Sequence, residues 1–495
     1  MSITKASIRS VIRGAGDALE RDDVDLALRL VYNFVEHIIT NPVCASAVFA
    51  SRDLDALCMR IGRHNYKRRV RLDLTAPTIS NGRLIVFLVS RLQRSGGHSR
   101  LVQDFIRSQP DKVNLILSTE VAGPSDADYF SKLFANAGNV HFIRAPGGNL
   151  SARLDWLQAM LLARQPEHVY LFNHHQDSVA VAALVPELRF EASYCHHGDH
   201  HLCLGVHLSH LIHLDFHPMG FHCCREQLGI DNHYLPLTFE DKSADDAARD
   251  YINNIGQLTT ATAARFNKIE VPYYVSYLDL IPEVLATTNG RHLHIGKLSP
   301  WALRRLRSNL SRRGIESGRL IYLEWTPSVW RALQSHHVDI YLASFPYGAA
   351  LTLIEAMGAG IPVILHQHMY SRVLSCLELA YLQAFSWSEP QDLLNHLANL
   401  TPERLQQEGL LARKRYLQYH RPEILQTYFS GRQHAAIAVP PLREGFQPRW
   451  DEWAAWVDSQ MTCSNLLRTN GFRVLRKMRL FFGSVLIGWK ALPRG

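Results

Sequence analysis

The sequence contains no uninterrupted apolar run long enough to span a bilayer, so we expect no membrane-spanning helix. Its first residues, MSITKASIRSVIRGAGDALERDD, lack the apolar core of a secretory signal. The eight cysteines are scattered and form no C-x-x-C pair, which favours reduced thiols over a disulfide framework. Together these absences predict a cytoplasmic protein.

Acidic residues are also missing from the last part of the chain, residues 462–495, where arginine and lysine alternate with apolar side chains. This pattern predicts a basic amphipathic helix that binds the anionic inner face of the plasma membrane. The alternative is a final helix packed on the protein body with a solvated basic rim. The formal net charge of the whole chain is +8, which suits an anionic ligand or surface.

The length of 495 residues is too great for one compact core, so several domains are expected. Beyond a helical stretch at the start, short apolar runs alternate with amphipathic helical patterns, as in parallel sheets covered on both faces. We predict an α/β protein with two tandem Rossmann-like, doubly wound domains. The expected segments are a helical extension (1–77), a first and a second Rossmann-like domain (78–238 and 239–435), and C-terminal helices with the basic tail (436–495).

Four polar clusters follow predicted strands, and the first is SGGHSR. Gly96 and Gly97 allow the backbone to approach a ligand closely, and the helix that follows offers free amides to an anion. His98 is expected at the start of this helix as a neutral imidazole that can accept a proton. The carboxyl ends of parallel strands meet at one edge, so we expect all four clusters to face one cleft.

The second cluster, called here the histidine belt, holds eleven of the 26 histidines, between His174 and His222. A zinc or iron site is one interpretation, although the spacing matches no defined metal signature such as HExxH. Structural hydrogen bonding is a second. The one we favour is a polar cleft floor that binds sugar or acceptor groups and includes catalytic residues. The candidates are His174, His175, His196, His197, Asp199 and His200.

The third cluster lies in TATAARFNKIEVPYY, near the start of the second domain. Lys268, next to Asn267, could neutralise a diphosphate leaving group, as a metal ion would. A surface lysine after a strand is the simpler alternative. Lys297 in HIGKLS is a second candidate cation.

The fourth cluster is FPYGAALTLIEAMGAGIPVIL. Small residues precede a predicted helix there and let its amino end bind an anion. Glu355 follows one turn later, within reach of groups beyond a phosphate. Packing alone explains the later alanines and glycines, but not the polar start of the helix. The predicted anion-binding residues are Gly348, Ala349, Ala350, Leu351 and Thr352.

These motifs resemble those of the nucleotide-sugar glycosyltransferases with the GT-B fold, over roughly residues 80–435. SFPYGAALTLIEAMGAGIPVI is similar to the donor-binding loop and helix of that superfamily. FNKIEVPYYVSYLDLIPEVL is similar to a segment of the O-linked N-acetylglucosamine transferase and HMW1C-like group, in which a lysine meets the donor diphosphate. Lys268 takes that place here. CHHGDHHLCLG resembles a segment of bacterial members of the group.

The resemblance implies transfer of a hexose or N-acetylhexosamine from a nucleotide sugar, with UDP as the expected carrier, to a glycan, lipid-linked or protein acceptor. It implies no metal and no cofactor, and a role in bacterial envelope polysaccharide or glycoconjugate synthesis. The resembling retaining enzymes usually carry a glutamate where this chain has Tyr347, which favours inversion. His98, His200 and Asp199 are the catalytic candidates, and Gly97 joins the donor-binding set. The competing hypotheses are a metal-dependent hydrolase and a non-catalytic membrane or nucleic-acid binding protein; we expect no nucleic-acid partner.

Overall fold

The structure is a computed structural model that describes residues 2–41, 44, 46–70, 83–94, 96–135, 138–242, 257–431 and 437–460. The chain divides into two compact units, residues 1–446 and 447–495. The predicted basic tail lies outside the described residues, as do residues 71–82 and 243–256 near the predicted domain boundaries. No helix in the described part of the chain is long and apolar enough to cross a membrane.

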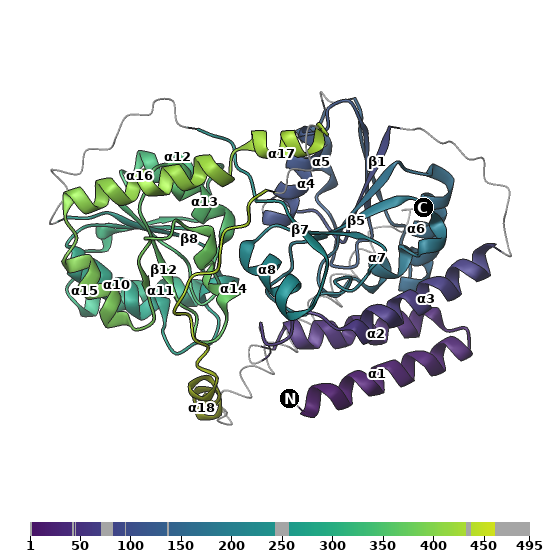
Figure 1. The fold of residues 1–495 in the computed structure, drawn as a ribbon. Helices are drawn as coiled ribbons and strands as arrows, with labels where there is room; N and C mark the ends of the chain where they lie inside the picture. Colours follow the sequence, from purple (N-terminus) through teal and green to yellow (C-terminus); the bar gives the residue numbers. More distant parts are fainter. Residues whose placement is uncertain are drawn as a thin grey trace, which may run out of the picture. The chain divides into compact units, whose positions relative to one another are not determined.

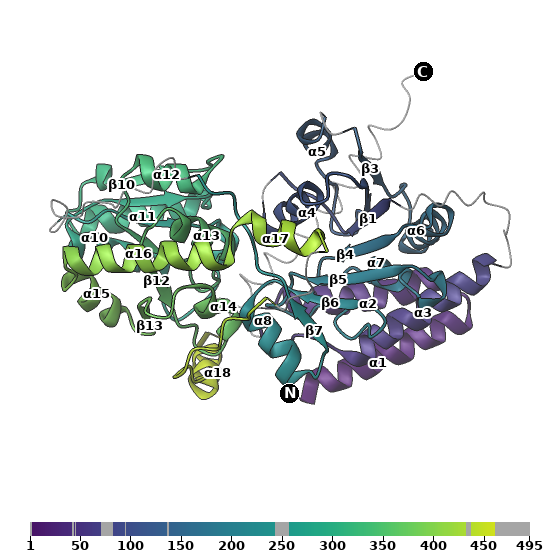
Figure 2. The same ribbon diagram turned by 45° about the horizontal axis from the view of Figure 1, so that its top comes forward.

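Three N-terminal helices pack beneath the first sheet (Figures 1 and 2). The sequence predicted the middle one because its apolar residues recur at helical spacing, and Asp23 caps it by accepting a 2.9 Å hydrogen bond from the amide of Leu26. Buried residues of these helices share one core with strand β1 and helices α6 and α7, so the extension is part of the first domain's packing. The helices are α1 (Ser2–Glu20), α2 (Val24–Ile39) and α3 (Arg52–Val70).

Helix α3 is joined to the first domain by two close contacts. Asp55 accepts hydrogen bonds from the amides of Gly205 and His207, at 2.7 Å and 2.9 Å, in the loop beyond β5. At Gly62 the backbone of α3 approaches α7 so closely that a Cβ atom would lie 1.9 Å from the carbonyl oxygen of Ala182. The contact therefore requires glycine.

The first sheet is parallel, with strand order β3-β2-β1-β4-β5-β6-β7. Strand β1 is apolar at every position because both of its faces are covered: Phe87 points into one core and Val86 into another. The strands are β1 (Leu84–Val89), β2 (Val113–Ser118), β3 (Val140–Arg144), β4 (His168–Phe172), β5 (Glu191–His196), β6 (Ile212–Asp215) and β7 (Asn232–Tyr234). The helices are α4 (Gly97–Arg107), α5 (Ala127–Leu133), α6 (Leu150–Arg164), α7 (Ser178–Ala183) and α8 (Pro218–His222), followed by a π-helical turn (Cys223–Gln227).

The second sheet is also parallel and has the order β10-β9-β8-β11-β12-β13. Its strands are β8 (Thr260–Ala263), β9 (His292–Ile295), β10 (Leu320–Leu323), β11 (Ile340–Leu342), β12 (Val363–His366) and β13 (Ser386–Trp387). Its helices are α9 (Phe266–Ile269), α10 (Tyr277–Thr288), α11 (Pro300–Arg312), α12 (Val329–Ser335), α13 (Ala350–Gly358), α14 (Arg372–Ser375), α15 (Pro390–Ala398), α16 (Pro402–Tyr419) and α17 (Pro422–Phe429). Helix α18 (Trp450–Gln460) belongs to the second unit.

In both sheets the first strand in sequence lies third in space, and later strands are added on either side of it. This reversal of strand order is the doubly wound arrangement predicted from the sequence. Helix α17, at the end of the predicted second domain, packs on α4 of the first: the ring of Phe429 lies 5.0 Å from that of Phe105 (Figure 2). The two sheets belong to one compact unit, so the boundary at residue 238 remains a prediction.

We predict that Gly62→Ala destabilises the protein by about 1–3 kcal/mol, because the added methyl group must push α3 away from α7. The measurement is the midpoint of thermal unfolding followed by circular dichroism. Gly147→Ala is the matched control, since its Cβ would meet nothing within 4 Å. Equal midpoints for the two variants would contradict the packing described here.

Candidate active site

The polar clusters lie where the strand order of each sheet reverses. Strand β1 lies between β2 and β4, and β8 lies between β9 and β11. The connection after β1 therefore runs to one side of its sheet and the connection after β4 to the other, and the same holds for β8 and β11. The loops at the carboxyl ends of such strands form the usual ligand crevice of doubly wound folds. Three of the predicted clusters follow β1, β8 and β11, and the histidine belt begins after β4.

Lys268 contacts the loop that leads into α13. Its Nζ donates a 2.6 Å hydrogen bond to the carbonyl oxygen of Gly348, although the two residues are far apart in the sequence. Burial lowers the pKa of Lys268. Gly348 is itself required for space, because a Cβ there would lie 2.6 Å from Sγ of Cys376. The structure thus brings together the third and fourth predicted clusters.

Helix α13 begins at Ala350, one residue before the start expected from the sequence, and no side chain caps it. The amides of Ala350, Leu351 and Thr352 are in the first turn, where a helix has no internal acceptors for them. The hydroxyl group of Thr352 is not directed to a ligand, since it lies 2.7 Å from the Tyr341 hydroxyl and donates to the carbonyl oxygen of Ala349. The anion-binding capacity of this turn therefore comes from its backbone amides and from Lys268.

Glu355 lies deeper than its predicted role requires. The residue is 7% exposed, and its Oε2 accepts a 3.0 Å hydrogen bond from the amide of Trp330 in the first turn of α12. Burial raises the pKa of Glu355, and the hydrogen bond from Trp330 opposes this effect. The carboxylate binds the amino end of α12 in this structure, and its contact with a donor sugar or ribose stays a prediction.

His98, His174 and His197 form a group that we call the imidazole triad. The ring of His98 stacks on that of His197 at a centroid distance of 4.4 Å and an interplanar angle of 2°, and it meets His174 edge-on at 4.8 Å. His98 Nε2 donates a 2.9 Å hydrogen bond to the carbonyl oxygen of Phe172, which can only accept. This leaves Nδ1 of the neutral ring as a proton acceptor.

The imidazole triad is neutral at pH 7. Burial, followed by the nearby imidazoles of His197 and His174, keeps the pKa of His98 well below its ordinary value. Burial also lowers the pKa of His197 to about 3 and that of His174 to about 4. A neutral imidazole has one ring nitrogen that can accept a proton, and in His98 this is Nδ1.

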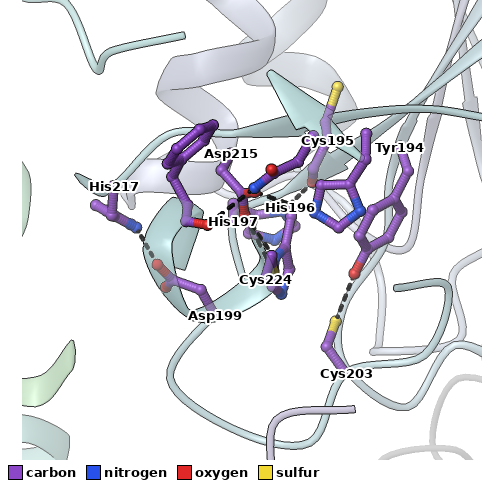
Figure 3. A network of polar contacts seen from close by, with 12 residues as sticks. Tyr194, Cys195, His196, His197, Asp199, Cys203, Asp215, His217 and Cys224 are labelled. Atoms are coloured by element: carbon purple, nitrogen blue, oxygen red, sulfur yellow. Dashed lines mark hydrogen bonds and ion pairs between the residues drawn. The ribbon is translucent and has the colours of Figure 1, made fainter. Parts of the chain in front are cut away.

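Asp199 pairs with a histidine that the sequence analysis did not select. Its Oδ2 accepts a 2.8 Å hydrogen bond from Nδ1 of His217 (Figure 3). Nδ1 of His200 lies farther away, 3.8 Å from Oδ1. Burial alone would lower the pKa of His217, but the Asp199 carboxylate raises it. For Asp199, burial acts to raise the pKa, and the interactions with His217 and His200 hold it far below its ordinary value. Asp199 therefore pairs with His217 rather than with His200.

The histidine belt also lies near the loop that precedes α13. The positive charge of Lys268 contributes to lowering the pKa of His200 and His201, after burial in both cases. The ring of His201 lies 6.0 Å from that of Tyr347. A Cβ on Gly97 would lie 3.6 Å from Leu351, so the starts of α4 and α13 are neighbours. The four predicted clusters therefore converge.

Three predicted residues lie apart from this convergence. The side chain of His196 is buried and hydrogen-bonds Asp215, whereas Asn267 is exposed. Lys297, the second candidate cation, is 57% exposed and forms an ion pair with Glu324 at 2.9 Å. Another predicted cleft histidine, His175, packs edge-on against His200 at a ring-centroid distance of 5.0 Å and so lies within the belt.

Comparison with solved structures identifies the fold. No family model and no curated protein sequence matches the chain. The Anabaena protein Alr3699/HepE, solved with UDP and glucose, superposes with a TM-score of 0.51 at 14% identity, covering 70% of this chain and 98% of that chain. The galactosyltransferase WaaB of the lipopolysaccharide outer core (TM-score 0.48, 13% identity, 71% and 100% covered) and a mutant O-GlcNAc transferase of Thermobaculum terrenum (0.47, 15%, 87% and 97%) also match. The chain has the two-domain GT-B fold.

We predict that Asp199→Asn lowers the pKa of His217, measured by NMR titration, because the variant removes the carboxylate that raises it. His217 has a raised pKa and Asp199 a lowered one, so the pair stabilises the fold fully between their ordinary values of 3.8 and 6.5. This contribution is lost as pH rises through the folded-state pKa of His217, and again as pH falls through that of Asp199. If the difference in free energy of unfolding between wild type and variant did not change with pH, the ion pair would be refuted.

Proposed function

We propose that the protein is a glycosyltransferase that moves a sugar from a nucleoside diphosphate sugar to an acceptor hydroxyl. The observation that supports this most is the meeting of the starts of α4 and α13, with Lys268 on one side and the neutral His98 on the other. The amides and Lys268 supply charge that a departing diphosphate needs, and His98 supplies a proton acceptor. These are the two chemical requirements of glycosyl transfer by displacement.

In this mechanism the first turn of α13 binds the donor diphosphate. Its amides and the ammonium group of Lys268 stabilise the negative charge that develops as the bond to the sugar breaks. Lys268 Nζ now donates to the Gly348 carbonyl and would turn toward the anion. Because these groups perform the task of a metal ion, the chemistry needs no catalytic metal. UDP is the proposed carrier, in keeping with UDP-glucose in the HepE structure.

His98 is the proposed base. Its Nδ1 would take the proton of the acceptor hydroxyl as that oxygen attacks the anomeric carbon, while the bond to Nε2 holds the ring in place. Direct attack opposite to the leaving diphosphate inverts the anomeric configuration. Tyr347 in place of the usual glutamate is consistent with inversion. The Asp199–His217 pair then has an orienting role in the cleft rather than the role of base.

For the acceptor we propose a glycan or glycoconjugate of the bacterial cell envelope. The support is the sequence of residues 462–495, whose basic and apolar side chains suit an anionic membrane surface at which a lipid-linked acceptor would be found. The protein would then act as a peripheral enzyme on the cytoplasmic face. Flotation with vesicles containing anionic lipid, with and without these residues, tests this part alone.

Release of UDP from UDP-glucose, UDP-galactose and UDP-N-acetylglucosamine tests the reaction, and we predict that Lys268→Met lowers kcat about 10²–10³-fold with the active donor. Methionine keeps the apolar stem and removes the charge. Lys297→Met is the matched control and is expected to retain activity, because Lys297 is exposed and paired with Glu324. Equal activity of the two variants would show that Lys268 does not serve the leaving group.

We further predict that His98→Asn lowers kcat for transfer about 10²–10⁴-fold without changing UDP affinity in calorimetry. Since burial and neighbouring imidazoles lower the pKa of His98, its base form persists below pH 6.5. The value of kcat/KM should therefore stay constant from pH 8 to pH 6.5 and fall only at lower pH. An acid limb centred at or above 6.5 would exclude His98 as the base.

A further inference from the structure

A second cluster of ligand-type side chains lies behind the imidazole triad, between β5, β6 and the π-helical turn. It consists of His196, His213, Asp215 and Cys224, with exposed fractions of 1%, 4%, 0% and 1%. Figure 3 shows His196, Asp215 and Cys224 close together. The proposed reaction uses none of them. Four side chains of this kind, wholly removed from water, need a physical explanation, because buried polar groups are costly unless they are satisfied.

Strand pairing and the π-helical turn bring these side chains close together. Strands β5 and β6 pair in parallel with His196 opposite Asp215. His213 and Asp215 are two residues apart and so share one face of β6. The π-helical turn then carries Cys224, a free thiol, to the same point.

The four side chains bring one ligand atom each close to the others. Asp215 Oδ1 lies 2.9 Å from His196 Nδ1, and Cys224 Sγ lies 3.5 Å from that nitrogen and 3.7 Å from that oxygen. His213 Nε2 lies 3.3 Å from Asp215 Oδ2. One ligand atom from each of the four falls within 4.8 Å of every other. Zinc bonds of 2.0–2.3 Å at tetrahedral angles separate ligand atoms by about 3.3–3.6 Å.

Hydrogen bonding within the protein leaves this cluster incomplete. His213 Nε2 is buried and has no hydrogen-bond partner among the described residues, although it faces the carboxylate, and His196 Nε2 has none either. This nitrogen of His213 lies 3.3 Å from Oδ2 of Asp215, within the cluster. A cation there would use its lone pair, and one carboxylate with one thiolate would balance a divalent charge.

We propose that His196, His213, Asp215 and Cys224 bind one structural zinc ion. The site is closed by protein, as structural zinc sites are, and leaves no open position for substrate. Asn232 holds the carboxylate in place, since its Nδ2 donates a 2.5 Å hydrogen bond to Asp215 Oδ2. The ring of Tyr194 flanks both imidazoles, at 5.4 Å from His196 and 5.0 Å from His213. Such outer partners fix the orientation of metal ligands.

The ion would fasten the edge of the first sheet. It would join the ends of β5 and β6 to the turn that precedes β7, close to the loop that carries Asp199. This inference does not depend on the proposed glycosyl transfer, because it concerns the packing of the sheet. It revises the sequence-based expectation of no metal site, and it leaves the transfer step metal-free.

The test is metal analysis of the full chain, purified without chelator and dialysed into metal-free buffer. We expect about one zinc per chain by mass spectrometry. The X-ray absorption fine structure at the zinc edge should be fitted by one sulfur and three nitrogen or oxygen ligands. Cys224→Ser and Asp215→Asn should lower the zinc content at least tenfold. Cobalt replacement should give a thiolate-to-cobalt absorption band in the wild type that Cys224→Ser lacks.

Two variants serve as matched controls. Cys223→Ser removes the adjacent buried thiol, which contacts Gln227 instead, and should retain both the zinc and the cobalt band. His174→Ala removes a member of the imidazole triad, which also could hold a metal, and should retain the zinc. Wild-type protein without bound metal and without a cobalt band after titration would overturn the proposal. So would zinc that is lost in His174→Ala but kept in Cys224→Ser. The wild-type sulfur count decides the matter even if a variant fails to fold.

Discussion

Parallel pairing between strands is the constraint on which the rest of the structure depends. In-register backbone hydrogen bonds align Val86 of β1 with Leu115 of β2 and Val169 of β4. Every strand of the sheet therefore ends at the same edge, and side chains that are far apart in the sequence meet there. The same rule in the second sheet brings the turns after β8 and β11 together, which is how Lys268 reaches Gly348. The candidate site lies where the strand order reverses, because the loops of doubly wound sheets separate at that point.

Most of the fold could be predicted because its signals are local. Apolar runs predicted the strands, helical periodicity predicted α2, and small residues predicted a helix shortly after Gly348. The partners of individual side chains could not be predicted. Which histidine meets Asp199 depends on the direction of two side chains 18 residues apart, and His217 forms the bond rather than His200. In the same way, periodicity places Glu355 one turn into α13 but does not reveal that its carboxylate meets α12.

Burial gives the two sides of the candidate site different electrostatic properties. On the first-sheet side, removal from water keeps the imidazole triad uncharged, so it can accept a proton but does not attract an anion. On the second-sheet side, the amides of α13 and the ammonium group of Lys268 are positive. The Lys268 charge also disfavours protonation of His200 and His201. The second-sheet side thus carries the positive charge, and the imidazole triad on the first-sheet side carries none.

The abundance of buried histidine has a consequence for the whole molecule. Beyond the triad, burial lowers the pKa of His292 and His420 to about 3 and that of His294 to about 4. Each of these rings takes up a proton on unfolding once the solution is more acidic than the ordinary imidazole value of 6.5. Each therefore subtracts up to about 1.4 kcal/mol from the free energy of unfolding for every further pH unit. These rings therefore make the folded state less stable as the pH falls below 6.5.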